Sequence, residues 1–327
     1  MSLPSQTIEK VLKTAENKRI AVIGDYMLDR YVWGAVRRIS PEAPVPVVEV
    51  REDSERPGGA GNVLSNLISL GVKSFAVGLV GEDNYGRTLK ELLGVNGTDI
   101  DGLIPATDRP TTAKTRIFAE DQQVVRVDRE LTAPVEGALE ERILEQVKRA
   151  IAGADAVILQ DYNKGVLTPN VIRTAIGLAR ERKIPLIVDP KSDNFFDYLG
   201  ATVVKPNLRE AENALGRRLG SDSDIERGGK DLLVRLEAEM VLLTRGAQGM
   251  SLFTHNGAPH HIPTRAHAIA DVSGAGDTVV STMTVGLMAG LSGPEAAYLA
   301  TKAAGYVVSQ VGVVPITKEA LIAEGGD

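Results

Sequence analysis

The chain has 327 residues, of which 43% are hydrophobic and 24% charged, an ordinary composition for a globular protein with a sizeable core. Its formal net charge of −6 disfavours a nucleic-acid partner. The absence of cysteine excludes disulfides, thiolate metal ligands and a cysteine nucleophile. No apolar run is long enough to cross a membrane, and residues 1–18 lack the apolar core of a signal peptide. We therefore expect a cytoplasmic protein without a membrane partner.

Short apolar runs recur along the chain and predict buried strands. They span Lys18–Asp25, Ser74–Val80, Asp155–Gln160, Pro185–Asp189, Thr202–Lys205 and Met240–Thr244. Helical patterns lie between most of them, at Ala60–Leu70, Tyr85–Leu93, Val135–Ile151 and Asn170–Arg182. This alternation predicts an α/β fold, with a mostly parallel central sheet covered by helices on both faces.

Polar residues follow several of these predicted strands. They are Asp25, Asp161, Asp189–Lys191 and Lys205–Asn207. In mostly parallel sheets, ligands bind in a crevice at the carboxyl ends of the strands. We therefore expect these polar residues to converge on one crevice.

Two segments, Tyr31–Arg51 and about Asp99–Glu130, break the alternation of strands and helices. Both carry strand-like patterns and turn residues without a helix, which predicts a small separate sheet that acts as a lid. Ser40–Pro46 is too rich in proline for a central strand, so it predicts a stiff edge or a turn. The alternative is a pair of surface hairpins with solvated charges.

The second of these segments contains a predicted hairpin. Lys114 and Arg116 are two residues apart, so they share one face of a strand. Ala119–Asp121 predicts a turn, and Gln122–Asp128 predicts the returning strand.

The segment Ala270–Val280 combines acids, a hydroxyl and two glycines with a following run of small and apolar residues that predicts a buried helix. Such a loop presents backbone N–H groups at a helix start, where an anion binds. Asp277 lies in the first turn of that helix. A carboxylate beside an anion hole makes sense as a base that takes a proton from a hydroxyl during phosphoryl transfer. The alternative is an ordinary glycine-rich turn with an Asp near a helix start.

The glycines of Pro57–Asn62 partly match the motif of dinucleotide-binding proteins. Gly59 and Gly61 could open a dinucleotide motif, but Leu64 stands where the third glycine belongs. The pattern also indicates that these glycines follow a turn and not a clear strand. A P-loop is absent from the sequence, so neither a P-loop protein nor a Rossmann dehydrogenase is favoured.

Three segments together resemble the PfkB/ribokinase family of sugar kinases. Pro57–Asn62 is similar to its first signature, Asp271–Asp277 to its second, and Asn207–Glu210 to its Asn-x-x-Glu element, which helps to organise magnesium and phosphate. They occur in the family's order, and the resemblance runs from about Arg19 to the C-terminus. It implies a single kinase domain over residues 1–327 with a ribokinase-like three-layer fold, a small β-sheet lid, and ATP and Mg²⁺ as cofactors.

Within this family, Gly24–Tyr31, Arg38–Val47 and Asp161–Gly165 resemble the heptose 7-phosphate kinases. This implies phosphorylation of the anomeric hydroxyl of D-glycero-β-D-manno-heptose 7-phosphate, in the ADP-heptose branch of lipopolysaccharide precursor synthesis. Many such kinases are fused to an adenylyltransferase domain, and because the sequence stops at Asp327 we expect the kinase half alone. The alternatives are another PfkB-type sugar, sugar-phosphate or nucleoside kinase, or a sugar-binding regulator without catalysis.

The resemblance supports Asp277 as the base and implies the roles of the residues around it. Gly274, Ala275 and Gly276 would form the anion hole. The sugar would be bound by Asp25, Asp29, Gly58, Gly59 and Asn62. A helix cap or a turn is the alternative for Asp25, a solvated turn for Asp29, and a helix cap for Asn62.

The phosphate that the substrate already carries requires cations, since guanidinium and ammonium groups are the usual phosphate ligands. Lys114, Arg116, Arg126 and Lys164 are the candidates. Each could instead be a solvated surface cation, and Arg126 could pair with Asp128.

The nucleotide is expected to contact residues near the carboxyl ends of the later strands. These are Lys191, Asn207, Thr244, Gly246 and Gly249, the last three in a segment that resembles the family's nucleotide loop. Glu210 is expected to act on magnesium through bound water, and no direct metal ligand is assigned. The four histidines, at 255, 260, 261 and 267, lack zinc-site spacing and predict a polar strand edge.

The expected lid has apolar residues on both of its faces. They are Val47, Val48, Val50, Ile117, Phe118, Val124, Val125 and Val127. One face can cover the sugar, but the other would leave valine and isoleucine side chains in water. A small sheet is marginally stable and its free edges invite pairing, so we expect a homodimer joined through the lids. The alternative is a monomer whose lid folds only when sugar binds.

Overall fold

The computed structural model describes residues 3–94, 97–120, 122–264, 271–310 and 312–325. Within these residues, the centre of the molecule is a nine-stranded sheet. Its strands are β1 (Arg19–Gly24), β4 (Lys73–Gly81), β5 (Asp99–Ala106), β8 (Ala156–Gln160), β9 (Leu186–Asp189), β10 (Val203–Val204), β11 (Met240–Thr244), β12 (Met250–Thr254) and β13 (His260–Ile262). The six apolar runs that predict buried strands all lie in this sheet.

The order of the large sheet is β13-β12-β11-β10-β9-β8-β1-β4-β5. Neighbouring strands from β5 to β11 pair in parallel, whereas β12 and β13 pair antiparallel. The predicted mostly parallel sheet is confirmed. The expectation for β5 is wrong, because Asp99–Ala106 pairs with β4 at the edge of the large sheet and is not part of the small one.

Helices cover both faces of the large sheet, and the alternation of side chains along β1 shows why. Ile20 and Val22 point into one apolar core, while Ala21 and Ile23 point into the other. The first core is completed by α1 (Ser5–Ala15), α2 (Ala60–Ser69), α3 (Asn84–Gly94), α8 (Ala275–Met288), α9 (Gly293–Val307) and α10 (Lys318–Ala323). The second is completed by α4 (Gly137–Ala152), α5 (Pro169–Arg182), α6 (Leu208–Leu215) and α7 (Asp222–Arg235). The fold is therefore the predicted three-layer sandwich.

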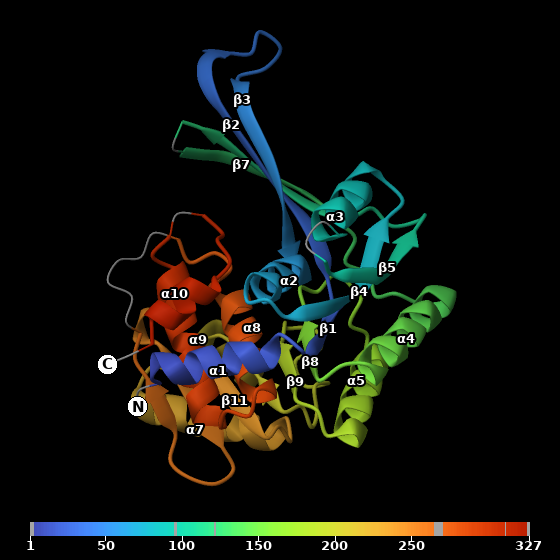
Figure 1. Cartoon of the computed structure of the whole chain (residues 1–327). Helices are drawn as coiled ribbons and strands as arrows, with labels where there is room; N and C mark the ends of the chain where they lie inside the picture. Colours follow the sequence, from blue (N-terminus) through green and yellow to red (C-terminus); the bar gives the residue numbers. More distant parts are fainter. Residues whose placement is uncertain (1–2, 95–96, 121, 265–270, 311, 326–327) are drawn as a thin grey trace.

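A second sheet, of four strands within the described residues, extends away from this body (Figure 1). Its strands are β2 (Tyr26–Ile39), β3 (Pro46–Gly59), β6 (Thr112–Ala119) and β7 (Gln122–Arg129), in the order β3-β2-β6-β7. The parallel pairing of β2 with β6 joins two hairpins into one small sheet, so the alternative of separate surface hairpins is wrong. The first segment is also longer than predicted, because β2 begins at Tyr26 and β3 continues to Gly59.

The connections of the small sheet match the sequence patterns in part. Ser40–Pro46 contains the turn between β2 and β3, as its prolines indicate. The β6–β7 hairpin turns at Glu120, whose φ of 55° is left-handed, and Asp121 lies outside the described residues. The interpretation of a turn before the glycines is wrong, because Gly58 and Gly59 end a strand and α2 begins directly after them.

Two helical glycines offer a matched test of how tightly the second core is packed. Gly229 in α7 lies against the ring of Phe253, which an added Cβ would strike, whereas an added Cβ at Gly177 in α5 meets open space. Gly229→Ala is expected to lower the free energy of unfolding by about 1–3 kcal/mol through overpacking. Gly177→Ala is expected to raise it by roughly 0.5–1 kcal/mol through helix propensity. Urea unfolding of both variants checks this, and equal stabilisation by the two would contradict the packing around Phe253.

Candidate active site

The Asp271–Asp277 loop turns into α8 at Gly274, the N-cap residue, whose φ of 77° lies in the left-handed region that favours glycine. A Cβ there would also lie 2.8 Å from the amide nitrogen Nδ2 of Asn62. The first N–H groups of a helix have no carbonyl one turn earlier, so this end of α8 can hold an anion. Gly276 lies within that first turn, and the position of an added Cβ would be 3.4 Å from the Nζ of Lys205.

Asp277 lies in the first turn of α8 and is only 5% exposed to solvent. Three side chains donate hydrogen bonds to its carboxylate. Asn62 in α2 donates at 2.6 Å, Gln160 at the end of β8 at 2.9 Å, and the hydroxyl of Tyr162 at 3.0 Å. Asn62 is therefore not the cap of α2, which is Gly59.

Burial, and then the charge of the neighbouring Asp189, raise the pKa of Asp277 to about 6. The hydrogen bonds from Asn62 and Tyr162 and the charge of Lys205 act in the opposite direction. A carboxyl group with this pKa is ionised at neutral pH, and it is a stronger base than an exposed aspartate. The environment of Asp277 therefore suits proton abstraction.

A buried ion pair lies beside Asp277. Lys205, which follows β10, bonds Asp189 at the end of β9 at 3.1 Å, and their side chains are only 4% and 5% exposed. Gln160 links this pair to the base, since its amide nitrogen donates to Asp189 at 3.0 Å and to Asp277. The expected convergence of strand-end residues is met in part: Asp189, Lys191, Lys205 and Asn207 line one cavity, whereas Asp25 lines a separate one.

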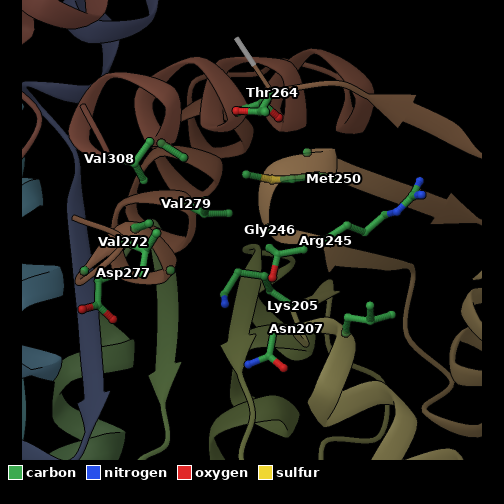
Figure 2. Close-up of a pocket in the computed structure, with 18 of the residues that line it drawn as sticks. Lys205, Asn207, Arg245, Gly246, Met250, Thr264, Val272, Asp277, Val279 and Val308 are labelled. Carbon is green, nitrogen blue, oxygen red and sulfur yellow. The ribbon is translucent and has the colours of Figure 1, made fainter. Parts of the chain in front are cut away.

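A cavity of about 740 Å³ opens next to Asp277. It is lined by Lys191, Asn207, Thr244, Gly246 and Gly249, which are the five residues expected to face the nucleotide. In Figure 2, Asp277 and Arg245 lie on opposite sides, with Lys205 and Asn207 between them. Met250, Val279 and Val308 form an apolar wall. The cavity thus has a polar, cationic end near the base and an apolar region that suits a flat ring.

Glu210 lies in the first turn of α6, next to the cavity residue Arg209, and is fixed by two partners. Its carboxylate accepts from the backbone N–H of Asn207 at 2.9 Å, and the Asn207 side chain accepts from the Glu210 N–H at 2.9 Å. This capping box explains the Asn-x-x-Glu spacing at the start of α6. Lys191 also bonds Glu210 at 2.6 Å. The residues that line the phosphate end of the cavity are therefore linked to one carboxylate.

Asp25 lies on the other side of Asp277 from the cavity. It directly follows β1 and is only 1% exposed to solvent. Its carboxylate accepts backbone hydrogen bonds from Tyr162 at 2.8 Å, Lys164 at 3.0 Å and Val166 at 3.3 Å. Burial, and then the nearby Asp161, raise the pKa of Asp25 to about 6. A carboxylate has about four acceptor positions, so Asp25 fixes the 162–166 loop and retains a position for a hydroxyl.

The two glycines before α2 are explained by close packing. A Cβ at Gly58 would strike the carboxylate of Asp29, and Gly59 has a φ of 57° and lies against the backbone oxygen of Asp25. Asp29 lies on β2 and bonds Arg116 on β6 at 2.6 Å, so the alternative of a solvated turn is wrong. These contacts bring Asp25, Asp29 and the glycines to the base of the small sheet, near Asn62.

The four candidate phosphate ligands form a group that we call the cation cluster: Lys114, Arg116, Arg126 and Lys164. Each is paired with a carboxylate. Lys114 bonds Asp128 at 3.1 Å and Glu130 at 3.2 Å, and Lys164 bonds Glu130 at 3.1 Å. Arg126 bonds Asp128 at 2.9 Å, which is the alternative that the sequence left open for it. The cluster joins the small sheet to the 162–166 loop and is not a set of isolated solvated cations.

A family model described as pfkB family carbohydrate kinase matches residues 17–320 of this chain. The chain belongs to this family. It is therefore a carbohydrate kinase, and the ATP and Mg²⁺ expected from the sequence are the cofactors of the family. No helix of the described residues is long and apolar enough to cross a membrane.

Relatives of this pfkB family kinase include two proteins named bifunctional protein HldE. The one from Pelobacter propionicus is 42% identical over 317 residues, which cover 97% of this chain and 65% of that protein. The one from Caulobacter vibrioides is 44% identical over 307 residues, which cover 94% and 63%. The chain thus spans less than two thirds of the length of these two relatives.

Solved structures share the fold at low sequence identity. Arabidopsis thaliana ribokinase, complexed with ribose and ATP, has a TM-score of 0.74 at 20% identity, covering 94% of this chain and 98% of that one. Phosphofructokinase-2 from Escherichia coli has a TM-score of 0.78 at 19% identity, covering 93% and 96%. The ribokinase-like fold predicted from the sequence is therefore confirmed.

Four residues at the site of this pfkB family kinase are not among those that the sequence assigned to it: Gln160, Tyr162, Lys205 and Arg109. Lys205 was expected only as a strand-end residue of the crevice. Gln160 reads as the last residue of an apolar strand, and an amide at that position is the only sequence signal it gives. Arg109 donates to the backbone oxygens of Leu131 and Lys164 at 3.1 Å.

The three histidines of the described residues, His255, His260 and His261, are not among the residues that line the cavity. His260 and His261 are on the edge strand β13, and the ring of His261 bonds Ser251 at 2.9 Å. His255 bonds the backbone oxygen of Ala238, and His267 lies outside the described residues. Among the described residues, no group of three or more His, Cys, Asp or Glu side chains could hold a metal.

Proposed function

We propose that this kinase transfers the γ-phosphoryl group of ATP to the anomeric hydroxyl of D-glycero-β-D-manno-heptose 7-phosphate, giving the 1,7-bisphosphate and ADP. The observation that carries the proposal is the position of Asp277. It lies between a nucleotide-sized cavity and a sugar side bordered by the cation cluster. A cation cluster suits a sugar that already carries a phosphate. The sequence resemblance to heptose 7-phosphate kinases indicates that this sugar is heptose 7-phosphate.

In the proposed reaction, one oxygen of Asp277 takes the proton of the anomeric hydroxyl. The hydroxyl oxygen forms a bond to the γ-phosphorus, and the bond from that phosphorus to the bridging oxygen of ADP breaks. The backbone N–H groups of Gly274, Ala275 and Gly276 at the start of α8 stabilise the charge of the transferred group. Lys205 lies close enough to Gly276 to add positive charge there.

The nucleotide would be held by the cavity residues Lys191, Asn207, Thr244, Gly246 and Gly249. Magnesium prefers few protein ligands and several waters, and the carboxylate of Glu210 beside Asn207 fits such a site. When bound, magnesium neutralises charge on the phosphates. Because Lys191 pairs with Glu210, its ammonium group is already held close to the expected position of the phosphates.

The sugar would be bound by Asp25, Asp29, Gly58, Gly59 and Asn62, with the cation cluster around its phosphate. The glycines permit the close approach of the backbone, and Asp25 retains an acceptor position. We expect the cytoplasm as the compartment, since a kinase of this kind draws on the pool of ATP there.

A substrate panel tests the proposed function. ADP release with heptose 7-phosphate is expected to exceed that with ribose, fructose 6-phosphate and nucleosides, and NMR is expected to find the new phosphate on C1. If another acceptor gives faster ADP release, that acceptor and not heptose 7-phosphate is the substrate. Absence of ADP production with every sugar would support a regulator on the same fold.

We also propose that two chains pair through the outer faces of their small sheets. The inner face carries Arg116 and the stacked rings of Tyr31, Trp33 and Phe118. On the opposite face, Val32 pairs with Ile117, which pairs with Val125, so three strands present a continuous apolar stripe. Valine side chains of the small sheet are open to solvent, since Val125 is 45% exposed, Val127 53% and Val50 61%. A second copy would cover this stripe and protect the sheet edges.

Light scattering at micromolar concentration without sugar tests the dimer. The mass is expected to be about twice the 34.8 kDa of one chain. Val125→Asp is expected to return it to about one chain and to raise KM for the sugar more than KM for ATP, since an unpaired charge opposes burial of the stripe. Val234→Asp is the matched control, because Val234 is 68% exposed on α7, and the dimer should persist. A wild-type mass equal to that of one chain would contradict the proposed dimer.

A further inference from the structure

Gln160 and Tyr162 have no role in the proposed mechanism. Both of these side chains donate a hydrogen bond to the same oxygen of Asp277. The amide nitrogen of Gln160 lies 2.9 Å from Oδ1, and the hydroxyl of Tyr162 lies 3.0 Å from the same atom. The other oxygen, Oδ2, accepts one side-chain hydrogen bond from the described residues, from Asn62 at 2.6 Å. The two oxygens of this carboxylate therefore have different environments.

A carboxylate oxygen has two acceptor positions, so the two donors fill Oδ1, and Oδ2 retains one free position. Only an oxygen with a free lone pair can accept a proton. We infer that Gln160 and Tyr162 are positioning residues that occupy Oδ1 of Asp277 and leave Oδ2 as the oxygen that receives the substrate's proton. This inference rests on the proposed function of Asp277 as the base.

The orientation agrees with the position of Asn62. Oδ2 faces Asn62, which is one of the residues expected to contact the sugar, and its α2 helix begins directly after the glycines of the sugar side. The backbone N–H of Tyr162 bonds Asp25, so the residue that fills Oδ1 is itself fixed by a second residue expected to bind the sugar. The 162–166 loop thus couples the sugar side to the orientation of the base.

Gln160 also lies between two buried carboxylates and donates a hydrogen bond to each. Its amide nitrogen donates to Oδ2 of Asp189 at 3.0 Å as well as to Asp277, so one NH₂ group bridges the two carboxylates. The charged groups that face Asp277 are Asp189, Lys205 and Lys191, the last with its Nζ 5.4 Å from the centre of the Tyr162 ring. Without the bridge, the two carboxylates would face one another with less compensation, which favours protonation of one of them.

Hydrogen bonds to a carboxylate favour its charged form, so the two donors also keep the base ionised. Burial and Asp189 raise the pKa of Asp277 to about 6, and the bond from Tyr162 opposes them. Burial raises the pKa of Tyr162 well above its ordinary value, so its hydroxyl remains a donor over the whole working pH range. Loss of this donor should therefore move the ionisation of Asp277 to higher pH.

The test is the pH dependence of kcat for Tyr162→Phe at saturating ATP and heptose 7-phosphate. We expect the acid limb of the profile to move up by about one pH unit relative to wild type. With a wild-type limb near pH 6, the loss of kcat is then about five-fold at about pH 6 and disappears near about pH 9. The ionisation of the substrate phosphate is common to both proteins, so the shift between them belongs to the enzyme. A loss that is equal at every pH would overturn the inference.

Gln160→Met is a second variant, which keeps the length of the side chain but removes both donated bonds. It is expected to move the acid limb in the same direction, and an unmoved limb would contradict the bridging role. If this variant fails to fold, Tyr162→Phe decides alone, because it removes a single oxygen atom.

Tyr198→Phe is the matched control. The buried hydroxyl of Tyr198 donates to a different carboxylate, Asp161, at 2.6 Å. This variant is expected to lose thermal stability while its acid limb stays in place. Asp277→Asn distinguishes failure of the proposed base from failure of the inference about Oδ1. Normal turnover of Asp277→Asn would overturn the base itself, whereas an inactive Asp277→Asn with an unshifted Tyr162→Phe would overturn only the present inference.

Discussion

Replacing Asp277 by Asn is expected to lower kcat by about two to four orders of magnitude, which is the usual range for loss of a general base. The side chain keeps its size but cannot take up the proton. Its surroundings can adapt, because the amide of Asn62, which donates to Oδ2 at 2.6 Å, can rotate and present its oxygen instead. KM for ATP and for the sugar should therefore change little. Steady-state kinetics over a wide range of both substrates check this result, and a near-normal kcat would contradict the role of Asp277.

The same variant is expected to be more stable than wild type at neutral pH. The pKa of Asp277 is raised to about 6 in the folded protein, so the folded state binds a proton more readily than the unfolded state does. The stabilisation from that proton is lost as the pH rises through about 6, and the ionised group is then buried at a cost. The gain in Tm of Asp277→Asn should thus be larger at about pH 7.5 than at about pH 5. Thermal unfolding at both pH values separates this effect from a folding defect, which would lower Tm at both.

The parts of the fold that the sequence predicts are those that local patterns determine. Apolar runs as short as Met240–Thr244 favour buried strands over helices, and the glycines of the Asp271–Asp277 loop mark a helix start at which an anion can bind. β5 was assigned to the wrong sheet because an edge strand and a lid strand share the same alternating pattern. Only the partner strand, which is distant in sequence, decides between them.

Side-chain partners across the fold lie beyond such patterns. Nothing near Gln160 in the sequence indicates that its amide bridges Asp189 and Asp277, which come from β9 and α8. The cations of the small sheet could be identified by residue type, but their pairing with acids could not. Glu130 lies outside the strands and still joins Lys114 to Lys164. These contacts depend on how the small sheet lies on the 162–166 loop, and this is a property of the tertiary structure.

The contacts of Arg116 make it the strongest single candidate for recognition of the substrate's phosphate. Its guanidinium bonds Asp29 at 2.6 Å and lies 5.2 Å from the centre of the Tyr31 ring, so both its position and its planar orientation are fixed. Burial acts to lower the pKa of Arg116, but Asp29 raises it overall, and the group stays charged. A phosphate dianion that enters from the sugar side can replace the Asp29 carboxylate with a bidentate contact of higher charge.

Arg116→Ala is therefore expected to raise KM for the phosphorylated heptose by roughly ten- to a hundred-fold, the value of a lost hydrogen bond to a charged group, and to leave KM for ATP nearly unchanged. For the same heptose without its phosphate, the variant should lose little, so discrimination between the two sugars falls. Arg126→Ala should have a smaller effect, since the side chain of Arg126 is 51% exposed and already bonds Asp128. Arg149→Ala, on α4, removes the same charge far from the small sheet and should change neither KM. Equal losses for ATP and sugar, or none, would remove Arg116 from the phosphate site and leave Lys114 and Lys164 to fill that role.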